Sequence, residues 1–101
     1  SIEDAIVTIR TFLSKTKRLM RLKKEVQEKQ NMDKAMASFK PPIFWKDKEL
    51  IKQQITNWSI KKIEILMTKI NETELLIKKH SPNSINILSD FLINESKKTS
   101  N

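Results

Sequence analysis

The stretch that decides the fold class is residues 60–79, which read IKKIEILMTKINETELLIKK. Ile63, Ile70 and Ile77 recur every seven residues, the spacing that places side chains on one face of an α-helix. Four more apolar residues widen this face: Ile60, Leu66, Met67 and Leu76. The pattern predicts a helix with one apolar face turned toward a core.

Both ends of this helix carry boundary signals. Ser59 precedes it and is a preferred N-cap residue, because its hydroxyl can accept a hydrogen bond from a free backbone N–H of the first turn. Lys78 and Lys79 lie in the last turn, where the helix dipole favours positive charge, and Pro82 follows just beyond. Glu74 and Lys78 are four residues apart, the spacing of a favourable ion pair on one helix face.

The N-terminal stretch predicts one long helix from Ile2 to about Lys29 with no breaker inside it. Its apolar residues also repeat every seven positions: Ala5, Phe12, Leu19 and Val26. Asn31 is a predicted N-cap for a short helix over residues 32–39, which ends before Pro41 and Pro42 because a residue preceding proline is pushed toward extended geometry.

Two more helices are predicted on either side of residues 60–79. One runs from Asp47 to about Asn57, with Leu50, Ile51 and Ile55 on one side. The other begins at Ser84 as N-cap and ends near Glu95, with an apolar face of five residues: Ile85, Ile87, Leu88, Phe91 and Leu92. No segment alternates with period two, so no strand is expected.

We therefore expect an all-α protein, a bundle of about four to five helices. Its length of 101 residues fits one domain, which we place at residues 1–96, followed by a polar tail at residues 97–101. The chain begins with Ser rather than Met, so we expect it to be a piece of a longer protein.

Residue types that are missing exclude several kinds of site. The chain has no Gly and no Cys, and it has one His. Without Gly there is no phosphate-binding loop of the known glycine-rich kinds, and without Cys there is no disulfide, thiolate zinc site or Cys nucleophile. No catalytic constellation of Ser, His and acid is recognisable, so we expect no catalytic activity, no cofactor and no metal.

The charge leaves two interpretations open. The chain carries 20 Lys and Arg against 12 Asp and Glu, a net charge of +8, which can indicate a nucleic-acid partner. However, 17 of the basic residues are Lys and only 3 are Arg, and the chain has 14 Ile. Lys and Ile both have AT-rich codons, so genome composition can also produce this balance.

The patterned part of this charge lies in the first helix, where residues 5–24 contain no acidic residue. Six basic residues form a candidate partner or phosphate surface: Arg10, Lys15, Lys17, Arg18, Arg21 and Lys24. They can equally form an ordinary solvated helix face. Phe12 is the only aromatic residue within the run, so stacking on single-stranded bases is not expected from it.

Most of the aromatic side chains gather near the two prolines. Phe44 and Trp45 follow Pro42, and Trp58 precedes the N-cap Ser59. These rings can pin the corners between helices, or they can be exposed anchors for a partner.

Read in order, these features resemble a known family. Residues 40–79 read KPPIFWKDKELIKQQITNWSIKKIEILMTKINETELLIKK, and residues 5–24 read AIVTIRTFLSKTKRLMRLKK. Together they resemble the C-terminal collar domain of the delta subunit of bacterial DNA polymerase III, part of the sliding-clamp loader. The matching features are a proline-led aromatic corner, a basic helix with a Gln, a Trp-Ser helix start and a Glu-Lys pair. The positions that carry them are Pro41, Pro42, Phe44, Trp45, Lys52, Gln54, Trp58, Ser59, Glu74 and Lys78.

The resemblance covers about residues 4–93 and implies a function in DNA replication. It implies an all-helical domain that joins the collar ring of a cytoplasmic clamp loader by docking on the delta-prime and gamma/tau subunits. The parent holoenzyme is a DNA-directed DNA polymerase, but the domain itself would be non-catalytic. The sliding clamp would be reached only through parts outside this chain, DNA contact would be secondary, and no membrane is involved.

One departure from the family concerns the turn after Lys78. Many members carry a Gly there, whereas this chain has Lys79, His80, Ser81 and Pro82.

Two other functions stay open. The chain can be a stand-alone basic helical nucleic-acid-binding domain, or a helical dimer held by its long first helix.

Overall fold

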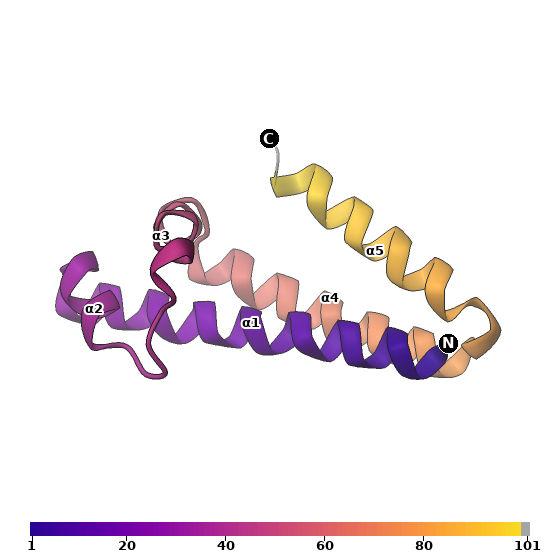
Figure 1. Ribbon diagram of the computed structural model, residues 1–101. Helices are drawn as coiled ribbons and strands as arrows, with labels where there is room; N and C mark the ends of the chain where they lie inside the picture. Colours follow the sequence, from indigo (N-terminus) through magenta and orange to yellow (C-terminus); the bar gives the residue numbers. More distant parts are fainter. Residues whose placement is uncertain (100–101) are drawn as a thin grey trace. The chain divides into compact units, whose positions relative to one another are not determined.

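The computed structural model describes residues 1–99, and within them the chain forms five α-helices, two short 3-10 helices and no strand (Figure 1). The elements are α1 Ile2–Lys29, α2 Met32–Ser38, η1 Trp45–Asp47, α3 Lys48–Asn57, α4 Ile60–Lys79, η2 Ser81–Asn83 and α5 Ser84–Thr99. The predicted all-α class and the number of helices are confirmed.

The predicted caps of α2 and α4 are present. The Asn31 side-chain oxygen accepts a hydrogen bond from the Lys34 backbone N–H at 2.9 Å. The Ser59 hydroxyl accepts one from the Lys62 N–H at 3.1 Å. Each bond satisfies a backbone donor that the first turn of the helix leaves without a partner inside the helix.

The end of α1 shows how a chain without glycine turns. Gln30 follows the helix with φ 53°, in the left-handed region, and its N–H donates to the Val26 carbonyl at 2.8 Å. Glycine is the usual residue in this position because a Cβ clashes there, at a cost of about 1 kcal/mol. The later turn from Lys79 to Ser84 instead closes through η2, and its residues keep negative φ.

The last helix differs from its prediction at both ends. Ser84 is the first residue of α5 after η2, and the helix continues to Thr99 rather than ending near Glu95. Residues 97–99 of the predicted tail are therefore helical, and residues 100–101 lie outside the described residues. Glu95 is buried, and the continued helix brings Lys98 to within 3.4 Å of its carboxylate.

The chain divides into two compact units. The first combines residues 1–14 with the residues from 67 onward. Its buried apolar side chains come from α1, α4 and α5: Ala5, Ile9, Ile70, Ile77 and Leu88. In the same unit the rings of Phe12 and Phe91 meet edge to face, with centroids 5.9 Å apart.

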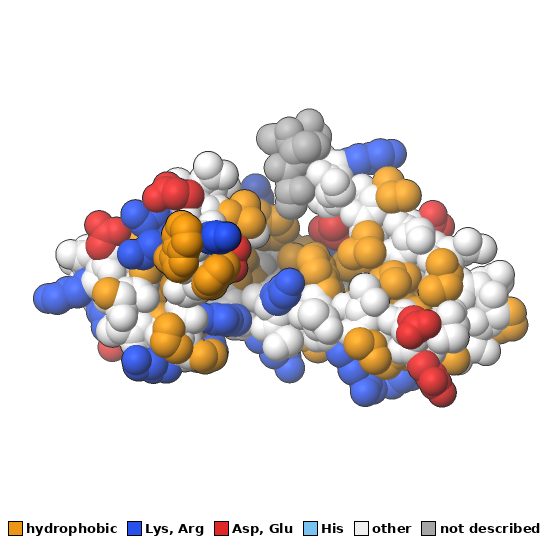
Figure 2. Space-filling model, viewed as in Figure 1, with side chains coloured by type: hydrophobic (Ala, Val, Ile, Leu, Met, Phe, Trp, Pro, Cys, Tyr) orange, Lys and Arg blue, Asp and Glu red, His pale blue; other side chains and the backbone are white. Residues whose placement is uncertain are grey.

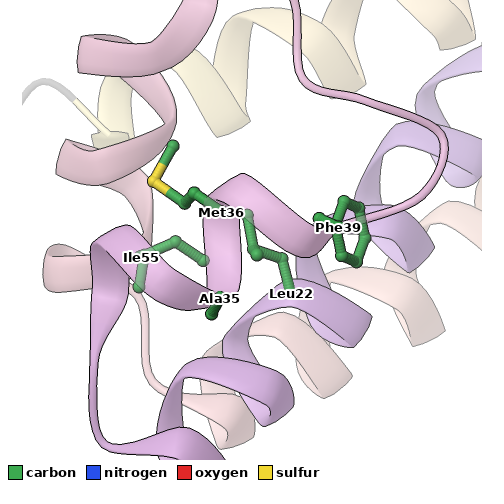
Figure 3. Close-up of a cluster of buried hydrophobic side chains, with 5 residues drawn as sticks. All are labelled: Leu22, Ala35, Met36, Phe39 and Ile55. Atoms are coloured by element: carbon green, nitrogen blue, oxygen red, sulfur yellow. The ribbon is translucent and has the colours of Figure 1, made fainter.

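The second unit, residues 15–66, has a core cluster built from α1, α2, α3 and the residue that follows α2. Its members are Leu22, Ala35, Met36, Phe39 and Ile55 (Figure 3). Five half-buried apolar side chains pack against the cluster: Leu19, Val26, Met32, Ile43 and Ile51. Ile55 and Ile51 therefore face the core as predicted, whereas Leu50 of the same predicted face is 56% exposed.

Candidate interaction site

Residues 40–44, which lie between α2 and η1, are called the proline corner. Two arginines of α1 hold its backbone in place. The Arg18 guanidinium donates hydrogen bonds from Nη2 to the carbonyls of Pro41 at 2.6 Å and Pro42 at 3.1 Å. Arg21 donates from Nη1 to the Lys40 carbonyl at 3.3 Å. The corner is therefore fixed by charge-assisted bonds from residues about 20 positions earlier in the chain.

The same arginines lie against Phe39, which is 1% exposed. The guanidinium carbon of Arg21 is 4.7 Å from the ring centroid, and that of Arg18 is 5.4 Å away. At these distances each cation is attracted to the ring. Arg18 and Arg21, predicted as part of a partner or phosphate surface, thus have a structural role at the corner. They keep their net positive charge there, because the carbonyl groups that accept their hydrogen bonds are neutral.

At the end of this corner and just after it, the structure exposes large apolar side chains. Trp45 is 72% exposed, and Phe44 and Leu50 are each 56% exposed. The Phe44 and Trp45 ring centroids are 6.0 Å apart with a 53° tilt. We call these three side chains, which come from the end of the proline corner, η1 and the first turn of α3, the aromatic patch. Figure 2 shows hydrophobic side chains gathered over the α3 region, with charged side chains around them. Of the two interpretations of Phe44 and Trp45, their exposure favours anchors for a partner over corner pins.

Lysines flank the aromatic patch. Lys46 places its ammonium nitrogen 5.4 Å from the Trp45 ring centroid. Lys40 and Lys48 are exposed on either side of it in the sequence. Lys46 and Leu50 were not among the predicted site residues. The signal available for them was their position within five residues of Trp45.

The rest of the basic surface on α1 divides by its contacts. Lys15, Lys17 and Lys24 are exposed and make no hydrogen bond or ion pair with any other described residue. Lys23, in the same run, instead donates to the Ile55 backbone carbonyl. Three lysines of the predicted surface are therefore available to an anionic partner.

Arg10 lies in the first unit and belongs to an ion cluster there. Its Nε is 3.0 Å from one carboxylate oxygen of Glu74, and Lys78 Nζ is 3.1 Å from the other. The predicted Glu74–Lys78 pair is thus present, and Arg10 is an addition that sequence spacing did not reveal. Hydrogen bonds from Arg10 and Lys78 lower the pKa of Glu74, and they outweigh the opposing effect of partial burial.

This cluster predicts a specific pH dependence for Glu74→Gln. Because the folded-state pKa of Glu74 is below its ordinary value of 4.5, the carboxylate stabilises the fold above that pH, and the stabilisation is lost as pH falls through the folded pKa. We expect Glu74→Gln to be less stable than the wild type near neutral pH, with the difference shrinking below about pH 4.5. Urea unfolding at several pH values measures this, with the exposed Glu72→Gln as the control. A difference that stays constant down to acid pH would contradict the ion cluster.

The remaining family-motif positions are placed at helix ends and between helices. Ser59 caps α4, Trp58 and Gln54 are half-buried, and Pro42 is exposed. Lys52 joins α3 to α2 through an ion pair of 3.1 Å with Asp33. The hydrogen bond to Asp33, followed by the two nearby carboxylate charges, raises the pKa of Lys52.

Among residues 1–99, no three His, Cys, Asp or Glu side chains gather as a metal site would require. No helix in the described part of the chain is both long and apolar enough to cross a membrane. No family model, curated protein or solved structure matches the chain.

Proposed function

We propose that this chain is a non-catalytic assembly module, the collar domain of a clamp-loader delta subunit of DNA polymerase III. The resemblance in sequence supports this proposal through the order of its motif positions. The all-α fold is of the kind that a collar domain requires. The module would work by joining helical neighbours, the delta-prime and gamma/tau subunits, rather than by chemistry.

The observation that carries the proposal is the construction of the proline corner. Behind the corner, Arg18 and Arg21 bind its carbonyls and pack on the buried Phe39. In front, Phe44 and Trp45 are exposed. Exposed aromatic side chains on a fixed backbone are typical anchors of a protein–protein interface, because less conformational entropy is lost when they bind.

A second function is favoured by one observation. Lys15, Lys17 and Lys24 are exposed without partners among the described residues, as a phosphate-binding helix face would need. The rival function is therefore a basic helical domain that binds nucleic acid by itself.

Two measurements on the full chain separate these functions. For the assembly module, we expect co-purification with delta-prime and gamma subunits. We also expect only weak duplex-DNA binding at physiological salt, with a Kd of about 10⁻⁴–10⁻⁶ M, as for any cationic surface. Charge reversal is best tested with the triple variant Lys15→Glu, Lys17→Glu and Lys24→Glu. Unlike a reversal at the arginines, it breaks no structural contact. Submicromolar DNA binding that this variant abolishes, together with failure to join the other subunits, would support the rival.

A further inference from the structure

The backbone that carries Phe44 and Trp45 is held by contacts on both sides. Ile43, next to Phe44, packs on the core cluster, and the carbonyls of Pro41 and Pro42 are held by Arg18. Trp45 begins η1, whose turn is closed by the hydrogen bond from the Asp47 N–H to the Phe44 carbonyl at 2.9 Å. Both aromatic residues therefore lie on backbone that is fixed on either side, which lowers the conformational entropy that binding would cost.

The charge around the patch is mostly positive. Lys40, Lys46 and Lys48 are exposed and pair with no carboxylate in the described part of the chain. The opposing acids are Asp47, which is exposed, and Glu49, which lies 3.8 Å from Lys52. Residues 40–50 thus carry three positive charges without a carboxylate partner and one negative charge without a basic partner, Asp47. A partner of complementary charge would present carboxylates around its apolar contact.

We propose that the aromatic patch is the docking surface for an amphipathic helix of the neighbouring subunit. Aliphatic side chains of that helix would cover Phe44, Trp45 and Leu50, and its Asp or Glu residues would face Lys40, Lys46 and Lys48. This inference rests on the proposed assembly function and deepens it by naming the contact surface and the chemistry of the partner. A helix is the fitting element because residues 1–99 offer no sheet edge to which an extended peptide could add.

Two other occupants fit the patch less well. A second copy of this chain, docked about a two-fold axis, would bring the same lysines against each other, and like charges disfavour that contact. Single-stranded nucleic acid would satisfy the lysines, but Leu50 offers no stacking surface and the Lys46 ammonium already lies near the Trp45 ring.

The test measures the affinity of the full chain for delta-prime and gamma subunits, for wild type and for variants of the patch. Trp45→Ala should weaken assembly by about 30-fold, as loss of an interface hot spot does. Lys46→Glu should weaken it about tenfold and reduce its salt dependence, because a favourable charge becomes a repulsive one. The matched controls, Leu75→Ala and Lys61→Glu, change exposed residues outside the patch and should leave affinity within about twofold. Circular dichroism confirms that each variant keeps its helices.

Each alternative result has a definite meaning. If the wild type fails to join these subunits, the proposed function is wrong and the docking surface is wrong with it. If the wild type joins them and Trp45→Ala joins equally well, the docking surface alone is wrong. The same holds if Trp45→Ala leaves assembly unchanged but abolishes binding to single-stranded oligothymidine, or abolishes self-association in sedimentation. Those two results would assign the patch to nucleic acid and to a second copy, respectively.

Discussion

Phe39→Ala is expected to lower the free energy of unfolding by about 3–5 kcal/mol, the cost of truncating a fully buried aromatic side chain. Phe39 is 1% exposed and belongs to the core cluster with Leu22 and Ile55. The substitution also removes the ring against which Arg18 and Arg21 lie. Small domains are stable by about 5–15 kcal/mol in total. The urea concentration at which half of the molecules are unfolded should therefore be much lower for this variant than for the wild type.

The neighbouring Phe44→Ala provides the matched control, because it removes the same ring from a site that is 56% exposed. We expect it to change the free energy of unfolding by about 0.5 kcal/mol or less. Urea titrations of the full chain, followed by circular dichroism, measure both. Equal losses from the two variants would show that the rings are not divided between core and surface as described.

Ile70→Ala should lower the free energy of unfolding by about 2–5 kcal/mol in the first unit. Ile70 is 1% exposed in the middle of α4, where it is one of the buried residues spaced seven apart. Removing three carbons from this position loses their burial and leaves a cavity, since neighbouring helices relax only in part.

The control for Ile70 is Leu75→Ala on the same helix, at a position that is 57% exposed. Its effect should stay within about 0.5 kcal/mol, and alanine also has the higher helix propensity. A large loss for Leu75→Ala, or a small one for Ile70→Ala, would mean that the buried face of α4 has been assigned wrongly.

The helices themselves could be predicted from sequence because their signals are local. The seven-residue repeats predicted α1 from Ile2 to Lys29 and the buried positions Ile63, Ile70 and Ile77 of α4. Asn31 and Ser59 were identified as caps because side-chain hydroxyl and amide groups bind backbone only a few residues away.

The candidate site could be predicted only in part because its contacts are long-range. Arg18 and Arg21 could be recognised as basic residues on one helix, but nothing in their spacing reveals that they bind carbonyls at positions 40–42. Phe39, Phe44 and Trp45 are similar in hydrophobicity, and only tertiary packing decides that Phe39 is buried while the other two are exposed. The extension of α5 past Glu95 also depends on packing, which buries that carboxylate beside lysines from two helices.

The structure also changes which basic residues matter for function. Of the three arginines, Arg18 and Arg21 hold the proline corner and Arg10 holds Glu74, so substitutions there would mix stability with binding. The exposed lysines can be changed without breaking such contacts. Experiments on partner choice should therefore vary lysines first and use the arginines as tests of the corner.

The most direct test of the proposed function is the mass of the complex that the full chain forms with delta-prime and gamma subunits, measured by sedimentation equilibrium. The assembly function predicts one species that contains this chain at a defined stoichiometry. The proposed docking surface predicts, in addition, less of that species with Trp45→Ala. Sedimentation of the chain apart from the other subunits, at concentrations where those subunits assemble with one another, would contradict it.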